Sequence, residues 1–182
     1  LLAGCGRSLP VVKGDSLVIS EERKLPAYTQ IRLECGADLV LTHGQVGNIT
    51  IKASQNMAPY VITEVSSGVL TVKMSPDFAY QFTKKLEICI PVDNSLTEIA
   101  VHGSGDISSH EQLQVKNLSC KVLGSGDMLL SLQAESLSFS VKGSGDMKIK
   151  GITQDLSVDI AGSGDFDGDA LQAKQATASI RG

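Results

Sequence analysis

Four aspartates are the residues of this sequence whose type and spacing could do chemistry. Each ends a Gly-Ser-Gly-Asp motif, and successive motifs begin 21, 19 and 19 residues apart. The four aspartates are Asp106, Asp127, Asp146 and Asp165. Stacked carboxylates attract hard cations such as calcium, and paired carboxylates across a cleft hydrolyse glycosidic bonds. The repeat therefore raises three hypotheses: a cation ladder, a ligand-binding stripe and a polysaccharide-cleaving site.

A repeat of about 20 residues is typical of a solenoid, in which each repeat forms one turn of a stack. The residues two, four and six positions before each motif are mostly apolar, and those between them are mostly polar. This alternation predicts a strand with one buried face. An apolar residue follows each aspartate, which predicts that a second strand begins there. We therefore predict an all-β fold, a parallel β-helix that we expect to be right-handed.

The motif itself is typical of a tight corner. Glycine at its first and third positions permits positive φ. These glycines are Gly103, Gly105, Gly124, Gly126, Gly143, Gly145, Gly162 and Gly164. The aspartate can accept backbone N–H groups in an Asx-type turn, and a charge-assisted hydrogen bond contributes about 1.5–3 kcal/mol. Two such bonds outweigh the repulsion between stacked carboxylates at a solvated corner, so a structural corner is favoured over a cation ladder or a binding stripe. No resident metal or cofactor is predicted.

Catalysis finds little support in these residues. His102, Ser104 and Asp106 have the residue types of a hydrolytic triad, but they follow one another around a corner, and no other motif has the histidine. Nothing in the sequence orients that histidine as a base. The connections between repeats are also too short to wall a cleft. We predict that the protein is not an enzyme, with a carbohydrate-active β-helix enzyme as the alternative.

Charge and hydrophobicity argue against nucleic-acid binding and against a membrane-spanning helix. The 182 residues carry a net charge of −4 without a basic run, so binding to a nucleic-acid backbone is not expected. No apolar stretch approaches the roughly 18 residues that a membrane-spanning helix needs. Aromatic residues make up 4% of the chain and tryptophan is absent, which predicts a single soluble domain with an aliphatic core.

The first residues resemble an export signal. Leu2-Ala3-Gly4-Cys5 matches the bacterial lipoprotein box, in which the cysteine is lipidated and becomes the mature N-terminus. We therefore expect a cell-envelope protein held in the outer membrane by a lipid on Cys5, with the leaflet left open, and a signal peptide already lost. Membrane contact is expected only through this anchor. The polar residues up to 24 are expected to form a tether. Because Gly182 stands where the next motif begins, we expect the native chain to continue.

The domain is predicted to have two continuous portions. Residues 25–95 carry a degenerate repeat, in which 31–39 aligns with 99–107, and residues 96–182 carry the regular repeats. Ser66-Ser67-Gly68 predicts a hairpin turn, and residues 75–85 predict a loop. We expect antiparallel strands in the first portion, where they cap or flank the β-helix.

Three cysteines remain besides Cys5. Cys120 occupies an inward position of the repeat and is interpreted as a small core residue. Cys35 and Cys89 lie in the first portion. We favour buried free thiols for all three, with a Cys35–Cys89 disulfide as the alternative.

The repeated Gly-Ser-Gly-Asp corners, together with the segments 31–41, 49–54 and 61–74, resemble the bacterial putative auto-transporter adhesin family, the head GIN domain proteins. The resemblance covers residues 25–182. It implies a β-helical, exported protein that is often a lipoprotein and is abundant in gut Bacteroidetes, and it supplies no catalytic residues. The family's name implies adhesion. We therefore predict a non-catalytic binding or adhesion module for a glycan or surface protein, with an envelope scaffold without a ligand as a further alternative. No oligomeric state is predicted.

Overall fold

The structure, a computed structural model, describes residues 8–181 and consists almost entirely of strands. The N-terminal half contains β1 (Val11–Lys13), β2 (Val18–Lys24), β3 (Gln30–Leu33), β4 (Asp38–His43), β5 (Asn48–Ser54), the 3-10 helix η1 (Ala58–Tyr60), β6 (Val61–Ser66), β7 (Val69–Met74), β8 (Ala79–Gln81) and β9 (Glu87–Val92). The C-terminal half contains β10 (Glu98–Val101), β11 (Ile107–Gln114), β12 (Asn117–Val122), β13 (Met128–Gln133), β14 (Ser136–Gly143), β15 (Met147–Gly162) and β16 (Phe166–Arg181).

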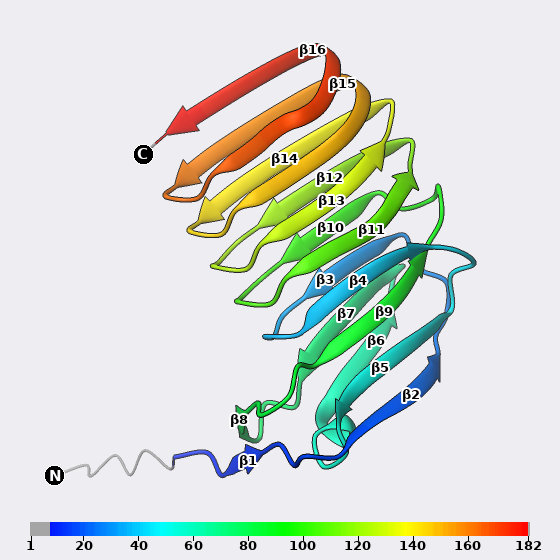
Figure 1. Ribbon diagram of the computed structural model, residues 1–182, viewed down its shortest axis with the longest axis vertical. Helices are drawn as coiled ribbons and strands as arrows, with labels where there is room; N and C mark the ends of the chain where they lie inside the picture. The colour runs from blue at the N-terminus through cyan, green and yellow to red at the C-terminus, as the bar shows by residue number, and fades with distance from the viewer. Residues whose placement is uncertain (1–7, 182) are drawn as a thin grey trace, which may run out of the picture.

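The strands of the C-terminal half form two parallel ladders. One ladder joins β3, β10, β12 and β14, and the other joins β4, β11 and β13. Each Gly-Ser-Gly-Asp motif connects a strand of the first ladder to a strand of the second, and we call such a pair of strands with its motif a coil. The first part of β15 pairs with β13 and its last part pairs with β14. Because β15 belongs to both ladders, the large sheet curls back on itself (Figure 1).

The interior of the curl is filled by aliphatic side chains in register. Ile99, Cys120, Phe139 and Val158 are aligned across neighbouring strands and are all buried. The valines and isoleucine two residues before each motif form a second buried row. Burying one such side chain stabilises the fold by roughly 1.5–3 kcal/mol. The period-two alternation therefore identified the inward positions two and four residues before each motif correctly, whereas Thr97, six residues before the first motif, is exposed and Leu156 is half-buried.

Antiparallel pairing is confined to the N-terminal half of the described chain. β2 pairs with β5, β5 with β9, and β6 with β7 in antiparallel fashion, while β7 and β9 also extend the two parallel ladders. The predicted hairpin turn is present between β6 and β7, where Ser67 and Gly68 both have positive φ. The all-β prediction is confirmed. The large sheet is nevertheless mixed and curled, so it differs from a uniform parallel β-helix.

Two predicted loops contain strands. Residues up to 24, expected to form a tether, contain β1 and β2, and β2 pairs with β5 along its whole length. Residues 75–85, expected to form a loop, contain β8, which pairs with β1 in a separate two-stranded parallel sheet. β1 and β8 have only three residues each, too few for an alternation of side chains to mark them as strands.

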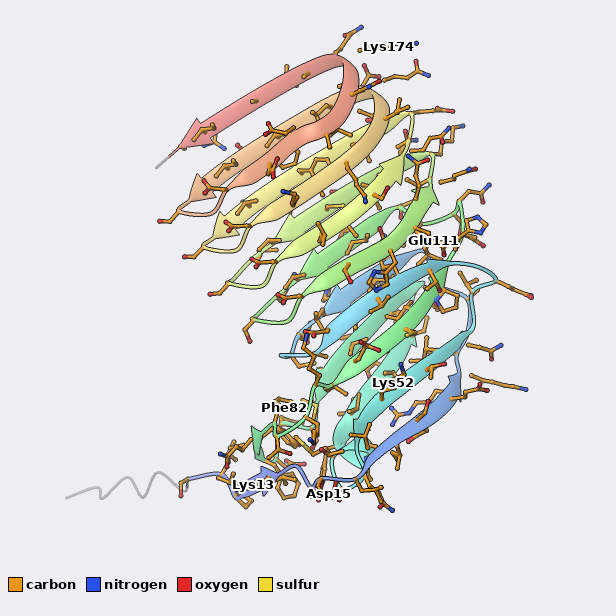
Figure 2. The ribbon with its side chains drawn as sticks, viewed as in Figure 1. Lys13, Asp15, Lys52, Phe82, Glu111 and Lys174 are labelled. Atoms are coloured by element: carbon orange, nitrogen blue, oxygen red, sulfur yellow. The ribbon has the colours of Figure 1, made fainter. Side chains whose placement is uncertain are left out.

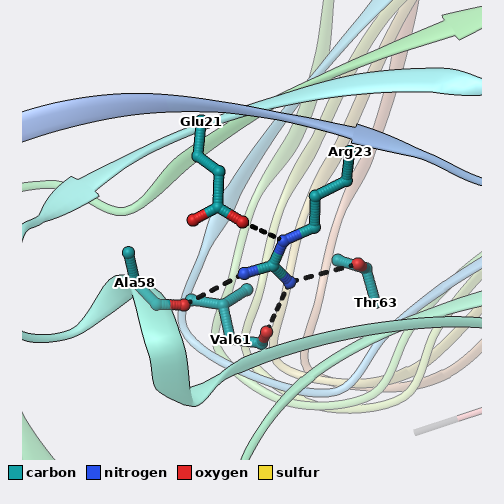
Figure 3. A network of polar contacts seen from close by, with 5 residues as sticks. All are labelled: Glu21, Arg23, Ala58, Val61 and Thr63. Carbon is teal, nitrogen blue, oxygen red and sulfur yellow. Dashed lines mark hydrogen bonds and ion pairs between the residues drawn. The ribbon is translucent and has the colours of Figure 1, made fainter.

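Arg23 ties together the two ends of the large sheet, which are β2 and β6 in the strand order. Its guanidinium donates to the carbonyl oxygens of Val61 and Ala58 at 2.6 and 3.1 Å, and to the Thr63 hydroxyl at 3.2 Å. The Arg23 Nε atom also lies 2.7 Å from a carboxylate oxygen of Glu21 (Figure 3). The planar guanidinium presents its donors in a fixed fork, so one side chain satisfies acceptors on β6 and before it.

Candidate functional site

The four predicted aspartates form a ladder of hydrogen bonds along the corners. One carboxylate oxygen of Asp106 accepts the backbone N–H of Asp127 at 2.9 Å. Asp127 accepts the N–H of Asp146 at 2.8 Å, and Asp146 accepts that of Asp165 at 2.9 Å. The sequence predicted carboxylates that accept backbone N–H groups, but within their own turn. The structure shows instead that each carboxylate binds the next coil, which links the stack from corner to corner.

The two glycines of each motif serve different purposes. The first glycines have positive φ, for example +144° at Gly103 and +143° at Gly162, as expected. The third-position glycines have no positive φ. They are required by close approach: a Cβ on Gly126 would lie 2.1 Å from the Gly105 carbonyl oxygen, and one on Gly145 would lie 2.1 Å from the Gly126 oxygen.

A fifth aspartate continues the column in the degenerate repeat. Asp38 precedes Leu39, which is in register with Ile107. One Asp38 oxygen lies 2.7 Å from the Lys85 ammonium, and this hydrogen bond raises the pKa of Lys85 above its ordinary value. Sequence reasoning missed this ion pair because Lys85 lies 47 residues away in a segment without a repeat. Within residues 8–181, no three histidine, cysteine or acidic side chains are grouped to hold a metal ion.

An open cleft of about 380 Å³ lies beside this column, across β4, β9, β11 and β13. Its polar lining includes Asp38, Glu87, Asp106, His110 and Asp127. The carboxylates already have partners: the Glu87 carboxylate lies 3.2 Å from the Lys52 ammonium, and the aspartates bind Lys85 or the backbone. Asp106, the acid of the rejected triad, accepts a backbone N–H. Each of these carboxylates therefore has at least one oxygen engaged in a hydrogen bond or an ion pair.

The opposite ladder carries a regular polar surface, which we call the hydroxyl face. Its central column is Ser119, Ser138, Ser157 and Thr177, which are aligned in register on β12, β14, β15 and β16. The flanking columns are Asn117, Ser136, Asp155 and Gln175 on one side, and Lys121, Ser140, Asp159 and Ser179 on the other. Strand spacing places neighbours in a column roughly 4.8 Å apart.

Two open clefts lie on the hydroxyl face. One has a volume of about 230 Å³ and is lined by residues of β14, β15 and β16, including Ser138, Ser157 and Thr177. The other has a volume of about 240 Å³ and lies around Ser119 and Ser136. The polar alternation is visible in the sequence, but the columns of hydroxyl groups follow only from the register between strands.

Two of the three charged side chains in the flanking columns of the hydroxyl face, Lys121 and Asp159, form ion pairs, and Asp155 forms none with the residues that the structure describes. The Lys121 ammonium lies 2.6 Å from a carboxylate oxygen of Glu98, and the Arg181 guanidinium lies 2.7 Å from an oxygen of Asp159. These pairs are partly exposed, so each contributes little stability. The central column itself carries no charge, because it consists of serine and threonine, whose hydroxyl groups can donate and accept hydrogen bonds.

The remaining predicted residues are the cysteines. Cys5 lies outside the described residues. Cys35, Cys89 and Cys120 are free thiols, as favoured from the sequence. Burial raises the pKa of the Cys35 thiol to about 11 and raises the pKa of Cys120 further. Because the thiolate is the reactive form, neither thiol is set up as a nucleophile.

Comparisons with known proteins agree on family and fold. A family model described as putative auto-transporter adhesin, head GIN domain, matches residues 27–182. No curated protein matches the chain. None of the described helices is long and apolar enough to cross a membrane.

Three crystal structures from gut bacteria resemble the fold at low sequence identity. A protein of Parabacteroides distasonis described as a putative lipid binding protein superposes with a TM-score of 0.74 at 21% identity, covering 93% of this chain and 81% of its own. A putative adhesin of the same species gives 0.72 at 22% identity with the same coverage. A putative adhesin of Bacteroides fragilis gives 0.59 at 16% identity, covering 91% of this chain and all of its own. At these identities, the likeness shows the fold alone.

Proposed function

The chain belongs to the family described as putative auto-transporter adhesin, head GIN domain, and from this membership and the hydroxyl face we propose that the protein is a non-catalytic binding module of the cell envelope. Its recognition surface is the hydroxyl face, and its partner is a glycan or a surface protein with an extended polar backbone. The Asp106–Asp165 ladder is proposed to be structural.

The alignment of Ser119, Ser138, Ser157 and Thr177 carries this proposal. The four hydroxyl groups of the column offer a hydrogen-bond acceptor at every strand, and the three serines also offer a donor, since the Thr177 hydroxyl donates to the Leu156 carbonyl oxygen at 3.3 Å. A partner with its own repeated hydroxyl or amide groups can bind several positions of the column at once. Each hydrogen bond contributes only about 0.5–1.5 kcal/mol net, so the number of aligned contacts determines affinity.

Such a surface favours contacts that are individually weak and that together give a higher overall affinity. One module that forms three or four net hydrogen bonds binds with a dissociation constant of roughly 1 mM, because that constant corresponds to about 4 kcal/mol. Many modules displayed on one cell then act together, since multivalency multiplies weak affinities. We propose that a lipid on Cys5 holds the module in the outer membrane, and that the stacked coils form a right-handed parallel β-helix as a stiff support.

The rival function is a carbohydrate-active enzyme at the cleft beside the aspartate column. A glycosidase needs one carboxylate to donate a proton and another to attack or to activate water. The carboxylates of that cleft bind lysines or backbone N–H groups, so oxygens that hydrolysis would need are already engaged within the protein. We therefore propose binding rather than hydrolysis.

The proposal is tested by screening the purified chain against glycans and matrix proteins, with one matched set of variants. Ser138→Arg combined with Ser157→Arg places bulky cations in the middle of the hydroxyl face. Gln112→Arg places the same side chain on the exposed surface of β11, in the other ladder. The double variant is expected to lose binding at least tenfold and Gln112→Arg to keep it. Equal binding by all three proteins would exclude the hydroxyl face, and release of reducing sugar ends would indicate the enzyme.

Protease treatment of intact cells tests the location. Cleavage of the domain, with a periplasmic marker protected, supports a surface module. Protection of both excludes adhesion to other cells and directs the search toward partners within the envelope.

A further inference from the structure

Exposed apolar side chains gather at the N-terminal end of the molecule. Five of the large hydrophobic residues that are exposed among residues 8–181 belong to β1, β2 or the segments beside β1, β2 and β8: Leu9, Val11, Leu17, Val18 and Phe82. Figure 1 shows β1, β8 and the start of β2 together along the lower end of the view. We call this surface the base. The other exposed large hydrophobics are scattered over the C-terminal half: Leu123, Leu129, Ile152 and Ile180.

Aromatic residues are concentrated at the same end. The chain has only three tyrosines, four phenylalanines and no tryptophan. Tyr60, Phe78, Tyr80 and Phe82 form a chain of neighbouring rings, with centroids 4.9 Å apart for Tyr60–Phe78, 5.9 Å for Tyr60–Tyr80 and 6.4 Å for Tyr80–Phe82. Phe82 is 38% exposed at the end of this chain (Figure 2). The core consists mainly of aliphatic side chains, so core packing does not explain why these aromatic rings lie together at an exposed end.

The two-stranded sheet at the base is separate from the large sheet, and the Asn56 and Thr83 side chains hold the end of β1 through hydrogen bonds to the carbonyl oxygens of Lys13 and Gly14. β1 and β8 pair only with each other, with Val12 opposite Tyr80. An isolated two-stranded sheet is at best marginally stable in water. Val11, on β1, is 66% exposed, and Leu9 just before it is 51% exposed. Such a sheet is stabilised when an apolar surface covers it.

We infer that the base is a membrane-contact surface that rests in the headgroup region of a lipid bilayer. This inference builds on the proposed lipid anchor at Cys5. Only four residue steps separate Cys5 from Leu9, so at full extension the two lie at most about 14 Å apart. A lipid on Cys5 therefore brings the base to the bilayer.

The chemistry of the base suits that position. Aromatic side chains with an apolar body and a polar tip are enriched at the membrane–water interface. The Tyr80 hydroxyl donates to the Ser75 carbonyl oxygen at 2.9 Å, so its polar tip is satisfied while the ring faces its aromatic neighbours. The exposed Lys13 at the end of β1 can meet lipid phosphates (Figure 2). Contact through the base points the axis along which the coils are stacked away from the membrane and leaves the hydroxyl face accessible to a partner.

Single tryptophan reporters test the inference, because the chain has no tryptophan of its own. The full chain is prepared with Cys5→Ser, so that no lipid is attached, and carries Val11→Trp or Phe82→Trp. Leu129→Trp is the matched control, since Leu129 is 50% exposed and lies on β13. The probe is vesicles of phosphatidylethanolamine and phosphatidylglycerol. We expect a blue shift and quenching by brominated lipid for both base reporters and neither effect for the control.

A second pair of variants measures the affinity. Val11→Asp is expected to lower vesicle binding about tenfold, because a charge replaces a side chain that transfers favourably into lipid. Leu129→Asp is expected to change it less than twofold. Val11 is exposed, so the variant keeps the fold, which circular dichroism checks.

The possible outcomes distinguish the membrane-contact surface from the proposed lipid anchor on Cys5. Fatty-acid labelling of the chain in cells, compared with its Cys5→Ser form, reports the anchor alone. Labelled Cys5 with unshifted base reporters overturns the membrane surface and leaves the anchor. Shifted base reporters with unlabelled Cys5 support the surface and remove the anchor. A blue shift without vesicles that grows with protein concentration shows that a second copy covers the base, and it overturns the inference.

Discussion

Substituting the glycines of the corners separates two physical reasons for their presence. Gly36, in the degenerate repeat, meets only the Ser104 hydroxyl at 3.5 Å when a Cβ is added, and it has no positive φ. Gly103 has free space around it but a φ of +144°. Gly126 has no positive φ, yet its Cβ would lie 2.1 Å from the Gly105 carbonyl oxygen and 2.8 Å from a Val101 methyl group.

Alanine at these three positions is therefore expected to have three different effects. Gly36→Ala changes the free energy of unfolding by less than about 0.5 kcal/mol, as for ordinary surface substitutions. Gly103→Ala destabilises by about 1–3 kcal/mol, the cost of an unfavourable backbone conformation. Gly126→Ala destabilises by about 3 kcal/mol or more, because the obstacle is the backbone of the preceding coil and a shift there disrupts the stacking as overpacking does.

Urea unfolding followed by circular dichroism measures these differences. The comparison holds if the slope of free energy against urea is the same for all variants, since a changed slope indicates a changed unfolding reaction. The order expected is Gly126→Ala least stable, then Gly103→Ala, then Gly36→Ala. If Gly126→Ala were as stable as Gly36→Ala, the close approach of neighbouring corners would not be a constraint, and the stacking argument would be refuted.

Four further predictions concern the rest of the fold. Asp127→Ala is expected to cost about 1 kcal/mol, less than the roughly 1.5–3 kcal/mol of a hydrogen bond to a charged group because this one is exposed. Asp127→Asn is expected to cost less because its amide oxygen still accepts the Asp146 N–H. Equal losses in thermal unfolding would contradict the ladder. Arg23→Ala is expected to lower the free energy of unfolding by about 2 kcal/mol, since it leaves several acceptors without a donor. Lys24, exposed on the same strand, is the control, and Lys24→Ala is expected to change the free energy of unfolding little. The urea midpoints of the two variants are compared. Burial raises the pKa of Cys35 to about 11 and the pKa of Tyr28 to about 12. The stability that the two neutral side chains contribute is therefore complete below about pH 9, near the ordinary thiol pKa, and is lost as the pH rises through the pKa values of the folded state. A melting temperature that stays constant up to pH 12 would refute this. Because the aspartate column is proposed to be structural, chelator and added calcium are both expected to leave the melting temperature unchanged.

The sequence predicted the inward and outward faces of the coils because those properties are local. A residue's side within a strand follows from alternation alone, so Ile99, Cys120 and Val158 could be placed in the core without knowing their neighbours. The period placed the four aspartates in one column for the same reason. The hydrogen-bond partner of each carboxylate could not be predicted in this way, because it depends on the rise from one coil to the next.

Pairings between distant short segments were missed. β1 and β8 pair although they are almost seventy residues apart, and Arg23 reaches Val61 from a distance of 38 residues. Neither contact repeats, and three-residue strands carry no alternation to reveal them. Gly151 shows a related difficulty. It has a φ of +129° inside β15 and bends that strand between the two ladders, but it belongs to no motif.

The two surfaces proposed here follow from the same repetitive fold. Stacking identical coils makes any outward position into a column, so Ser138 is aligned with Ser119 and Ser157 once the core positions are set. The same stacking leaves the interior of the first coil open, and a repeat protein needs a cap there because an uncovered end aggregates. The antiparallel strands and Arg23 close that end, while β1 and β8 extend beyond it with apolar side chains outward. A cap that only closed the stack would have a polar outer surface, and for this reason the apolar base indicates a contact rather than a cap alone.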